Sequence, residues 1–425
     1  MNKIIRPKTI IFTGFEHKQE HIKTAKDKGF FTVLLTLKER GKEAEIFDEV
    51  IEVDFYKKAE VDKLIPLLKQ KFNTKAIISN YEKFVVPRSY IAEKLGVVST
   101  SVYGACCSRN KILQRYALSV MPENIPWKKY QTTSGLKKAF KTLGPKVFLK
   151  FISGVKSRCI YYVENEEALV AAWEEFSQAL DNLDLDFQED YKYLDFRFDY
   201  PDPRKHFLIE KAIQGEQVTV ASFVGSHQVS HMPSVCDVYP AHMVGRDDSF
   251  LAFRILPSKH SDFLVQEAQK VTETATQILG LRYCGIHSEL IITPEKEIKI
   301  IEIASRIGGY RERMYRQAYG ISLSQQLMNA AIGKAITPNR KPQKYVSVIE
   351  LFPVNKGTFA SVSDPHKHLE SADEFKIKAT KGQPIGPARE GFSPVAWVMI
   401  TGKTYEDVYQ KSLAITQECE IVVEG

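Results

Sequence analysis

The sequence predicts a multidomain α/β protein that begins with a parallel sheet and ends with a small β-rich unit. Its 425 residues are too many for one ordinary hydrophobic core and indicate roughly two to four domains. Strand-like and helix-like segments alternate through residues 9–79, which is the order of a parallel sheet with crossover helices. From residue 345 onward, strand-like segments alternate with turns instead.

The N-terminal part begins with an apolar strand at residues 9–13, followed directly by Gly14. A glycine in this place is typical of nucleotide-binding βα units, but the sequence has no G-x-G-x-x-G pattern, so a dinucleotide site is not supported. The other elements predicted here are strands at 32–35, 49–53 and 76–79 and helices at 22–28 and 58–71.

The middle of the chain mixes helices with strands that are interrupted by glycine or proline. The helices are predicted at 108–118, 133–143, 164–180 and 261–279, and the strands lie within 146–163, 207–215, 218–224 and 285–303. The expected units are a Rossmann-like domain at 1–106, linker helices and a lid at 107–212, a central site-bearing part at 213–344 and an α+β cap at 345–425.

Composition excludes several classes of protein. Hydrophobic and charged residues make up 44% and 26% of the chain, and no apolar run approaches the length of a membrane span. The six cysteines are scattered without C-x-x-C spacing, which argues against a disulfide framework and a structural zinc site. A net charge of +7 is modest and is not gathered in one block, so nucleic-acid binding is not expected. We expect a cytoplasmic protein that does not bind membranes.

A glycine-containing loop at 151–159 lies between two strand-like segments and carries basic residues at Lys150, Lys156 and Arg158. A Walker loop leads into a helix, whereas this loop does not, so a phosphate under it would be held by backbone N–H groups and basic side chains. The alternative is an ordinary hairpin with surface lysines.

A predicted hairpin brings Glu289 and Glu302 together. If the loop covers 294–297, Ile291 pairs with Ile300 and the two glutamates face each other with their Cβ atoms about 5 Å apart. Opposed carboxylates destabilise a sheet unless a cation lies between them, and hard oxygen ligands suit Mg²⁺ on substrate phosphates. The hairpin therefore predicts a metal site and nucleotide chemistry, the alternative being a solvated face whose register differs by one residue.

Several motifs occur in a fixed order: Lys111, Lys150 before the glycine-containing loop, Glu210-Lys-Ala-Ile-Gln-Gly215, Glu289, and Glu302-Ile-Ala-Ser-Arg-Ile-Gly-Gly309. In this order and spacing the chain resembles the ATP-grasp superfamily, in particular the bacterial L-amino acid ligases of the bacilysin synthetase type. The resemblance implies an ATP-grasp fold with an N-terminal pre-ATP-grasp domain. It also implies that ATP, with Mg²⁺ or with Mn²⁺ in its place, drives amide formation through an acyl phosphate.

The resemblance also implies roles for individual residues. The residues expected around ATP are Lys111, Lys150, Gly154, Ser157, Arg158, Glu210, Lys211, Ala212 and Gln217. Those expected at the metal and the reacting carboxylate are Glu289, Glu302, Arg306, Gly308 and Gly309, with Lys150 and Arg306 as the catalytic pair. The remaining candidates for binding substrate carboxylates are His242, Arg254, Arg311 and Arg313.

The sequence departs from the family pattern at several positions. Gln217 stands where an acid binds the ribose hydroxyls, and Ala304 stands where many members carry a metal-binding Asn. The hairpin register places His287 opposite Ala304, either as a metal ligand or as a packed histidine.

The function expected is that of an ATP-dependent ligase acting on a small carboxylate and an amine. The alternatives are a biotin-carboxylase-like or purine-biosynthesis-type ATP-grasp enzyme and a nucleotide-binding regulatory protein without catalysis. Homodimers are common among the enzymes that the chain resembles, although no residue of this sequence indicates one.

Overall fold

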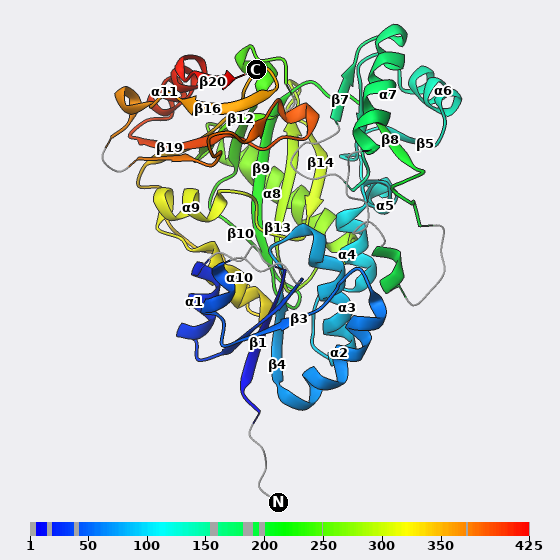
Figure 1. The fold of residues 1–425 in the computed structure, drawn as a ribbon, viewed down its shortest axis with the longest axis vertical. Helices are drawn as coiled ribbons and strands as arrows, with labels where there is room; N and C mark the ends of the chain where they lie inside the picture. The colour runs from blue at the N-terminus through cyan, green and yellow to red at the C-terminus, as the bar shows by residue number, and fades with distance from the viewer. Residues whose placement is uncertain are drawn as a thin grey trace, which may run out of the picture.

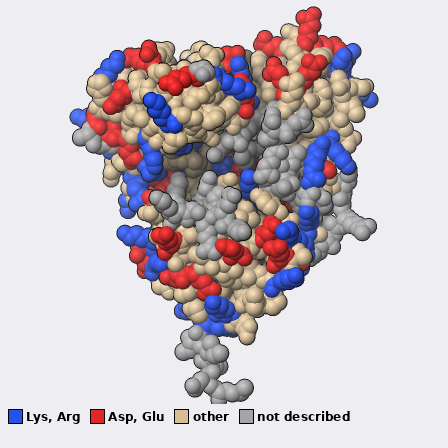
Figure 2. Space-filling model, in the orientation of Figure 1, with Lys and Arg blue, Asp and Glu red and all other residues tan. Residues whose placement is uncertain are grey.

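The computed structural model describes residues 6–14, 19–37, 42–153, 160–181, 190–194, 200–248, 250–370 and 373–424. In Figure 1 the N-terminal sheet lies at the bottom, a lid at the upper right and the C-terminal part at the upper left, with a large sheet between them. No helix within these ranges is long and apolar enough to cross a membrane. Figure 2 shows lysine, arginine, aspartate and glutamate side chains interspersed over one face.

The N-terminal sheet is parallel, as the alternation of strands and helices predicts, with the strand order β3-β2-β1-β4. Its strands are β1 (Lys8–Thr13), β2 (Phe31–Thr36), β3 (Glu49–Glu52) and β4 (Asn73–Ile78). The helices of this part are α1 (Gln19–Asp27), α2 (Lys58–Lys71) and α3 (Val85–Leu95).

The helix predicted at 108–118 is wrong in one respect, because the chain forms two helices there, α4 (Val102–Arg109) and α5 (Lys111–Ala117). Asn110 between them is extended, with φ −103° and ψ 109°, and its side chain accepts hydrogen bonds from the N–H groups of Ile112 and Leu113. An asparagine in this conformation is a favoured N-cap. The break places Lys111 at the first position of α5.

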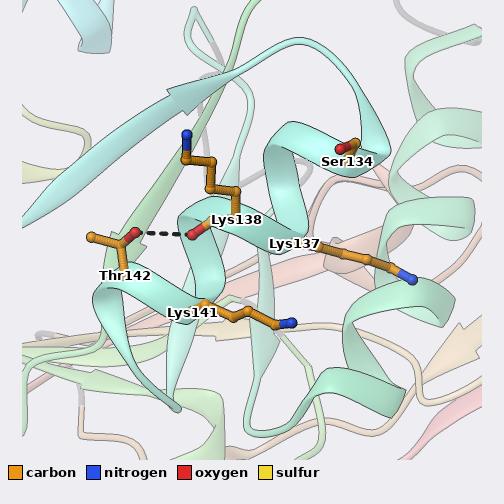
Figure 3. A pocket seen from close by; sticks show the side chains of 5 residues that line it. All are labelled: Ser134, Lys137, Lys138, Lys141 and Thr142. Atoms are coloured by element: carbon orange, nitrogen blue, oxygen red, sulfur yellow. Dashed lines mark hydrogen bonds between the residues drawn. The ribbon is translucent and has the colours of Figure 1, made fainter.

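The lid is an antiparallel sheet in the order β5-β8-β6-β7, covered by α6 and α7. Its elements are β5 (Trp127–Tyr130), α6 (Thr133–Leu143), β6 (Val147–Lys150), β7 (Ile160–Val163), α7 (Glu166–Asp181) and β8 (Phe207–Lys211). On the outer side of α6, a small pocket is lined by Ser134, Thr142 and three lysines (Figure 3). These are solvated side chains of one helix, and they are not joined to the site described below.

The large sheet is antiparallel and runs in the order β14-β13-β9-β11-β12-β15-β19-β17, with β10 paired to β9. Its strands are β9 (Glu216–Val224), β10 (Val229–His231), β11 (Cys236–Pro240), β12 (Leu251–Leu256), β13 (Cys284–Ile292), β14 (Ile298–Ala304), β15 (Tyr345–Leu351), β17 (Glu374–Ile377) and β19 (Ala396–Gly402). Three of the strands after residue 344, β15, β17 and β19, therefore extend the large sheet.

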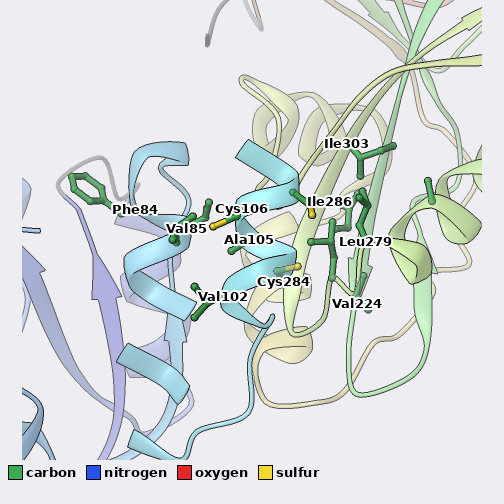
Figure 4. Close-up of a cluster of buried hydrophobic side chains, with 14 of the residues drawn as sticks. Phe84, Val85, Val102, Ala105, Cys106, Val224, Leu279, Cys284, Ile286 and Ile303 are labelled. Atoms are coloured by element: carbon green, nitrogen blue, oxygen red, sulfur yellow. The ribbon is translucent and has the colours of Figure 1, made fainter. Parts of the chain in front are cut away.

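Helices cover the two faces of this sheet. α8 (Asp262–Ile278) packs on the face that carries Val218 and Leu290, in a core that continues into the N-terminal part through Phe84 and Val102 (Figure 4). α9 (Arg311–Tyr319) and α10 (Leu323–Ala331) pack on the opposite face. The C-terminal part adds α11 (Tyr405–Glu418) and a small sheet of β16 (Gly357–Val362), β18 (Pro384–Ile385) and β20 (Ile421–Glu424).

Candidate nucleotide and metal site

The hairpin of β13 and β14 brings Glu289 and Glu302 directly opposite each other, as predicted, and His287 opposite Ala304. Glu302 accepts a hydrogen bond from Lys111 Nζ at 2.8 Å, so the first residue of α5 lies against the carboxylate pair. Both glutamate side chains keep some contact with solvent, being 25% and 17% exposed. The pair therefore faces an opening and is not sealed in the core.

Nearer the turn, the predicted register is wrong by one residue. Ile291 pairs with Lys299 and Leu290 with Ile300, and a bulge beside Glu289 leaves Ile301 without a partner on β13. The turn is shorter than expected because Lys296 adopts a left-handed conformation with φ 67°, and Thr293 N–H donates to the carbonyl of Glu297. The bulge restores the register before the glutamates are reached.

The two carboxylates differ in their protonation behaviour. Burial raises the pKa of Glu302 above its ordinary value, and the nearby carboxylates Glu82 and Glu289 add to the effect against the opposing charge of Lys111. Burial also acts to raise the pKa of Glu289, but His287, Arg306 and Lys111 outweigh it and lower that pKa to about 2. Two acids held this close favour a bound cation because a cation relieves their mutual repulsion.

His287 packs behind Glu289, with 3.5 Å between Nε2 and the carboxylate oxygen. Burial lowers the pKa of His287 to about 4, so the imidazole is neutral near pH 7. Its ring also fills the space beside Gly308, where an added Cβ would lie 2.5 Å from Nδ1. The histidine thus shapes the loop that follows β14.

Arg115 of α5 forms hydrogen bonds to the backbone of the bulge, a role that was not predicted from the sequence. Its guanidinium donates to the carbonyl oxygens of Ile300 at 2.9 Å and Ile301 at 2.7 Å, and to Glu210 Oε1 at 2.5 Å. Lys150 Nζ meets the other oxygen of Glu210 at 2.6 Å. These contacts connect the lid to the β13–β14 hairpin through buried charges.

Glu210 itself is buried between two cations rather than turned to solvent. Burial alone would raise its pKa, but Arg115 and Lys150 lower it to about 2. The N–H groups of the following residues are engaged within the protein, Lys211 donating to Pro126 O and Ala212 to Lys146 O. The N–H groups of Lys211 and Ala212 are therefore not free to bind an adenine. An adenine at this strand would contact backbone carbonyl oxygens or residues that follow Ala212.

Gln217 lies on β9 opposite Ile291 and is half-buried. Ile291 and Glu289 lie on one face of β13, so Gln217 shares the face of the two opposed glutamates. Gly154, Ser157 and Arg158, together with Lys156, lie outside the described residues.

Arg306 follows β14 and donates through Nε to Glu82 Oε2 at 2.8 Å. Burial opposes ionisation of Glu82, but Arg306, Arg109 and Lys111 hold its pKa below the ordinary value. Arg109 in turn meets Asp190 at 3.4 Å. The N-terminal part thus supplies an acid to the site.

Glu82 was not predicted from the sequence, although a signal for it exists. It comes four residues after the end of β4, at the carboxyl edge of a parallel sheet, where ligand sites of α/β proteins gather. Arg109, Arg115 and Asp190 have no comparable local signal, because their partners lie far away in the sequence.

The glycine pair after Arg306 has two different environments. A Cβ at Gly308 would collide with His287, whereas a Cβ at Gly309 would meet no atom within 4 Å. Tyr310 then adopts a left-handed conformation with φ 62° and is the N-cap residue of α9. The loop is tight on one side and open on the other, which is the shape needed for close approach of a ligand to backbone N–H groups.

The predicted carboxylate binders are only partly brought together. Arg311 is buried against Thr219, and Arg254 is buried against Glu350. His242 is exposed on the turn after β11, and no hydrogen bond or ion pair within the described residues joins it to the others. Arg313 lies farther along α9 in an ion pair with Glu374.

Residues 144–313 match the model of the ATP-grasp domain. This part of the chain is similar to ATP-grasp domains. This stretch includes the lid strands β6, β7 and β8, the β13–β14 hairpin and the glycine pair, so it covers most of the site just described. The resemblance drawn from the order of the motifs is confirmed.

Curated relatives are alanine–anticapsin ligases of Bacillus. One from Bacillus subtilis is 21% identical over 267 residues, which are 61% of this chain and 54% of the relative. Another, from Bacillus subtilis strain 168, is 23% identical over 286 residues, covering 64% of the chain and 56% of the relative. The chain thus spans about half of the length of these relatives.

Solved structures share the ATP-grasp fold over nearly the whole chain. The L-amino acid ligase from Bacillus licheniformis has a TM-score of 0.79 at 14% identity, with 99% of this chain and 100% of that one covered. An ADP complex of the N5-carboxyaminoimidazole ribonucleotide synthetase PurK has a TM-score of 0.68 at 17% identity, with 98% of each chain covered. The biotin carboxylase domain of the 2-oxoglutarate carboxylase from Hydrogenobacter thermophilus, in complex with MgADP and bicarbonate, has a TM-score of 0.68 at 15% identity. The match covers 99% of this chain and 92% of that one. At these identities the likeness establishes the fold.

Proposed function

We propose that this protein is an ATP-dependent ligase that joins a carboxylate, an L-amino acid, to an amine through an acyl phosphate and releases ADP and phosphate. The observation that carries the proposal is the pair Glu289 and Glu302, face to face beside Lys111 and with Arg306 near both. The alanine–anticapsin ligase relatives support the choice of an amino acid.

The residues present fit a magnesium ion. Two opposed carboxylates offer the hard oxygen ligands that Mg²⁺ prefers, and Mn²⁺ accepts the same donors. Within the part of the chain that the structure describes, no group of three acidic, histidine or cysteine side chains forms a metal cluster. Phosphate oxygens and water would supply the remaining ligands of an ion held by the two glutamates. The ion would neutralise the phosphates during transfer.

The side chains around the metal pair supply positioning and charge. Lys111 and Lys150 bind phosphate oxygens, and Arg306 offsets the negative charge that develops on the acyl phosphate. Glu82 fixes the guanidinium of Arg306 in its place before the substrate arrives. Because Lys111 is bonded to Glu302 in this structure, a metal ion would compete with Lys111 for the carboxylate of Glu302, and the nucleotide phosphates would compete with Glu302 for the ammonium group of Lys111.

The proposed reaction has two steps, a phosphoryl transfer and the attack of the amine. A carboxylate oxygen of the donor attacks the γ-phosphorus, ADP leaves, and the mixed anhydride is held at the glycine pair by the N–H groups of Gly308 and Gly309. The neutral amine then attacks the acyl carbon, phosphate leaves with the carboxylate oxygen, and the nitrogen loses one proton to the departing phosphate. Closure of the lid excludes water, which would otherwise hydrolyse the anhydride.

Phosphate release from Mg-ATP in the presence of pooled L-amino acids, with mass spectrometry of the products, tests this function. We expect a dipeptide mass and a loss of roughly 100-fold or more in turnover for Glu302→Gln, because phosphoryl transfer depends on the metal charge. Glu297→Gln is the matched control, since Glu297 is 62% exposed at the turn of the same hairpin. Unchanged turnover in Glu302→Gln would contradict the assignment.

A further inference from the structure

Tyr310 is a strained residue beside the site, because its backbone is left-handed, with φ 62°. Tyrosine rarely adopts this conformation, whereas glycine adopts it without cost. The two residues before it are Gly308 and Gly309, and neither of them has a φ in the left-handed range. The strain therefore lies on the residue of this loop that carries a large side chain. Strained residues of this kind cluster at functional sites, where the surrounding structure holds them in place.

The hydroxyl of Tyr310 fixes the side chain to the large sheet. It donates to Glu350 Oε1 of β15 at 2.9 Å and accepts from Lys378 Nζ, just after β17, at 3.3 Å. The other carboxylate oxygen of Glu350 accepts from Arg254 of β12 at 2.6 Å, so the acceptor is itself held in place. Burial raises the pKa of Tyr310, so its hydroxyl keeps the proton that it donates.

The ring of Tyr310 contacts two cations and a second aromatic side chain. The guanidinium of Arg254 lies 5.5 Å and Lys378 Nζ lies 5.6 Å from the ring centroid, distances at which cation–π attraction acts. The centroid of a ring of Trp397, on β19, lies 5.7 Å away. Groups on β12, β15 and β19 therefore hold one side chain, and their contacts offset the cost of its left-handed backbone.

The loop that Tyr310 ends carries three successive N–H groups without an acceptor. The N–H groups of Gly308, Gly309 and Tyr310 donate no hydrogen bond to any of the residues that the structure describes. Successive N–H groups in a turn form a concavity that binds anions. Space for an anion is available, because a Cβ on Gly309 would meet no atom within 4 Å. The backbone of Tyr310 ends this run of donors, so its conformation fixes how they are aligned.

We propose that Tyr310 is a positioning residue, whose left-handed backbone, fixed through its side chain, aligns the N–H groups of Gly308, Gly309 and Tyr310 on oxygens of the acyl phosphate. The inference rests on the proposed function. Lys111 and Arg306 supply full charges, whereas backbone N–H groups supply dipoles, which stabilise developing charge best when they do not have to reorient. Release of the Tyr310 side chain lets the loop relax to an unstrained conformation and turns the donors away.

The test measures the binding of inorganic phosphate, which stands in for the phosphoryl group of the acyl phosphate, with Mg²⁺ and ADP present. The dissociation constant is taken from the rise in melting temperature with phosphate concentration. Tyr310→Phe removes both hydroxyl contacts and keeps the ring, and we expect it to bind phosphate roughly tenfold or more weakly than the wild type. Tyr310→Gly adopts the left-handed conformation without cost but has no side chain to fix it, so the same loss is expected.

Tyr162→Phe is the matched control, and it keeps the affinity of the wild type for phosphate. Tyr162 also donates its hydroxyl to a glutamate, Glu164, at 2.9 Å, but it is 48% exposed on the lid.

Turnover supplies the second readout. In Tyr310→Phe we expect kcat for phosphate release to fall roughly tenfold while KM for ATP changes less than about twofold, because Lys111 and Lys150 bind the nucleotide. The two readouts together separate positioning from a loss of folded protein, which would lower turnover without weakening the binding of phosphate by the molecules that stay folded.

The inference is overturned if the wild type binds no phosphate beside MgADP, or if either Tyr310 variant binds phosphate as tightly as Tyr162→Phe does. Such a result together with dipeptide formation defeats this inference alone. Binding of phosphate that depends on Tyr310, without any release of phosphate from ATP, defeats the proposed function and leaves the alignment of the loop by Tyr310 standing.

Discussion

Arg115 gives the sharpest test of how the lid and the metal hairpin are held together. Arg115→Met replaces the aliphatic part of the side chain with an unbranched apolar chain and removes the charge and the donors of the guanidinium. Removing one partner of a buried ion pair costs about 3–5 kcal/mol of folding free energy. We use the lower value of about 3 kcal/mol, because Glu210 keeps its ion pair with Lys150 when Arg115 is replaced. The carbonyl oxygens of Ile300 and Ile301 also lose their donor, at about 1 kcal/mol or more each. The sum is about 5 kcal/mol.

A loss of this size is comparable with the whole stability of a modest domain, which is about 5–15 kcal/mol. The free energy of unfolding is measured by urea titration, followed by circular dichroism, for the wild type, Arg115→Met and Arg389→Met. Arg389→Met, the control, should lose less than about 1 kcal/mol because its ion pair is exposed. If Arg115→Met loses no more free energy of unfolding than Arg389→Met, the contacts of Arg115 do not hold the lid and the β13–β14 hairpin together.

Three further outcomes are expected. Gly308→Ala lowers the melting temperature because its Cβ would meet His287 at 2.5 Å, whereas Gly309→Ala leaves it unchanged and impairs only substrate binding; equal melting temperatures would contradict this difference. Burial raises the pKa of Asp190 to about 6 in spite of Arg109, against 3.8 in the unfolded chain, so protonation favours the folded state. The urea midpoint of the wild type relative to Asp190→Asn should therefore rise as pH falls from about 7 to about 4, and a constant difference would refute it. Removal of divalent ions with EDTA abolishes phosphate release and excess Mg²⁺ restores it, whereas release that persists would exclude a metal role.

The fold and the opposed glutamates could be predicted because they follow from local patterns. The alternation of strands and helices gives the parallel sheet, and two-residue periodicity along the hairpin gives the pair Glu289 and Glu302. The register near the turn could not be predicted in the same way. It depends on the left-handed Lys296 and on a bulge at Ile301, and no turn residue such as glycine marks either position.

The supporting charges were missed because their partners are distant in the sequence. Arg115 and Glu210 are 95 residues apart, and Arg306 and Glu82 are 224 apart. An arginine in a helix pattern carries no local sign of such a partner, since most are solvated. The break at Asn110 was visible in principle, because asparagine is a common N-cap, but the apolar spacing across it also suits one helix.

The central claim is that a carboxylate is activated by phosphorylation, and the origin of the oxygen in the released phosphate tests it most directly. Pooled L-amino acids labelled with ¹⁸O in their carboxylates are incubated with the protein, Mg²⁺ and ATP, and the phosphate is analysed by mass spectrometry. The mechanism predicts one ¹⁸O in each phosphate released together with a dipeptide. Dipeptide formation with unlabelled phosphate would contradict it.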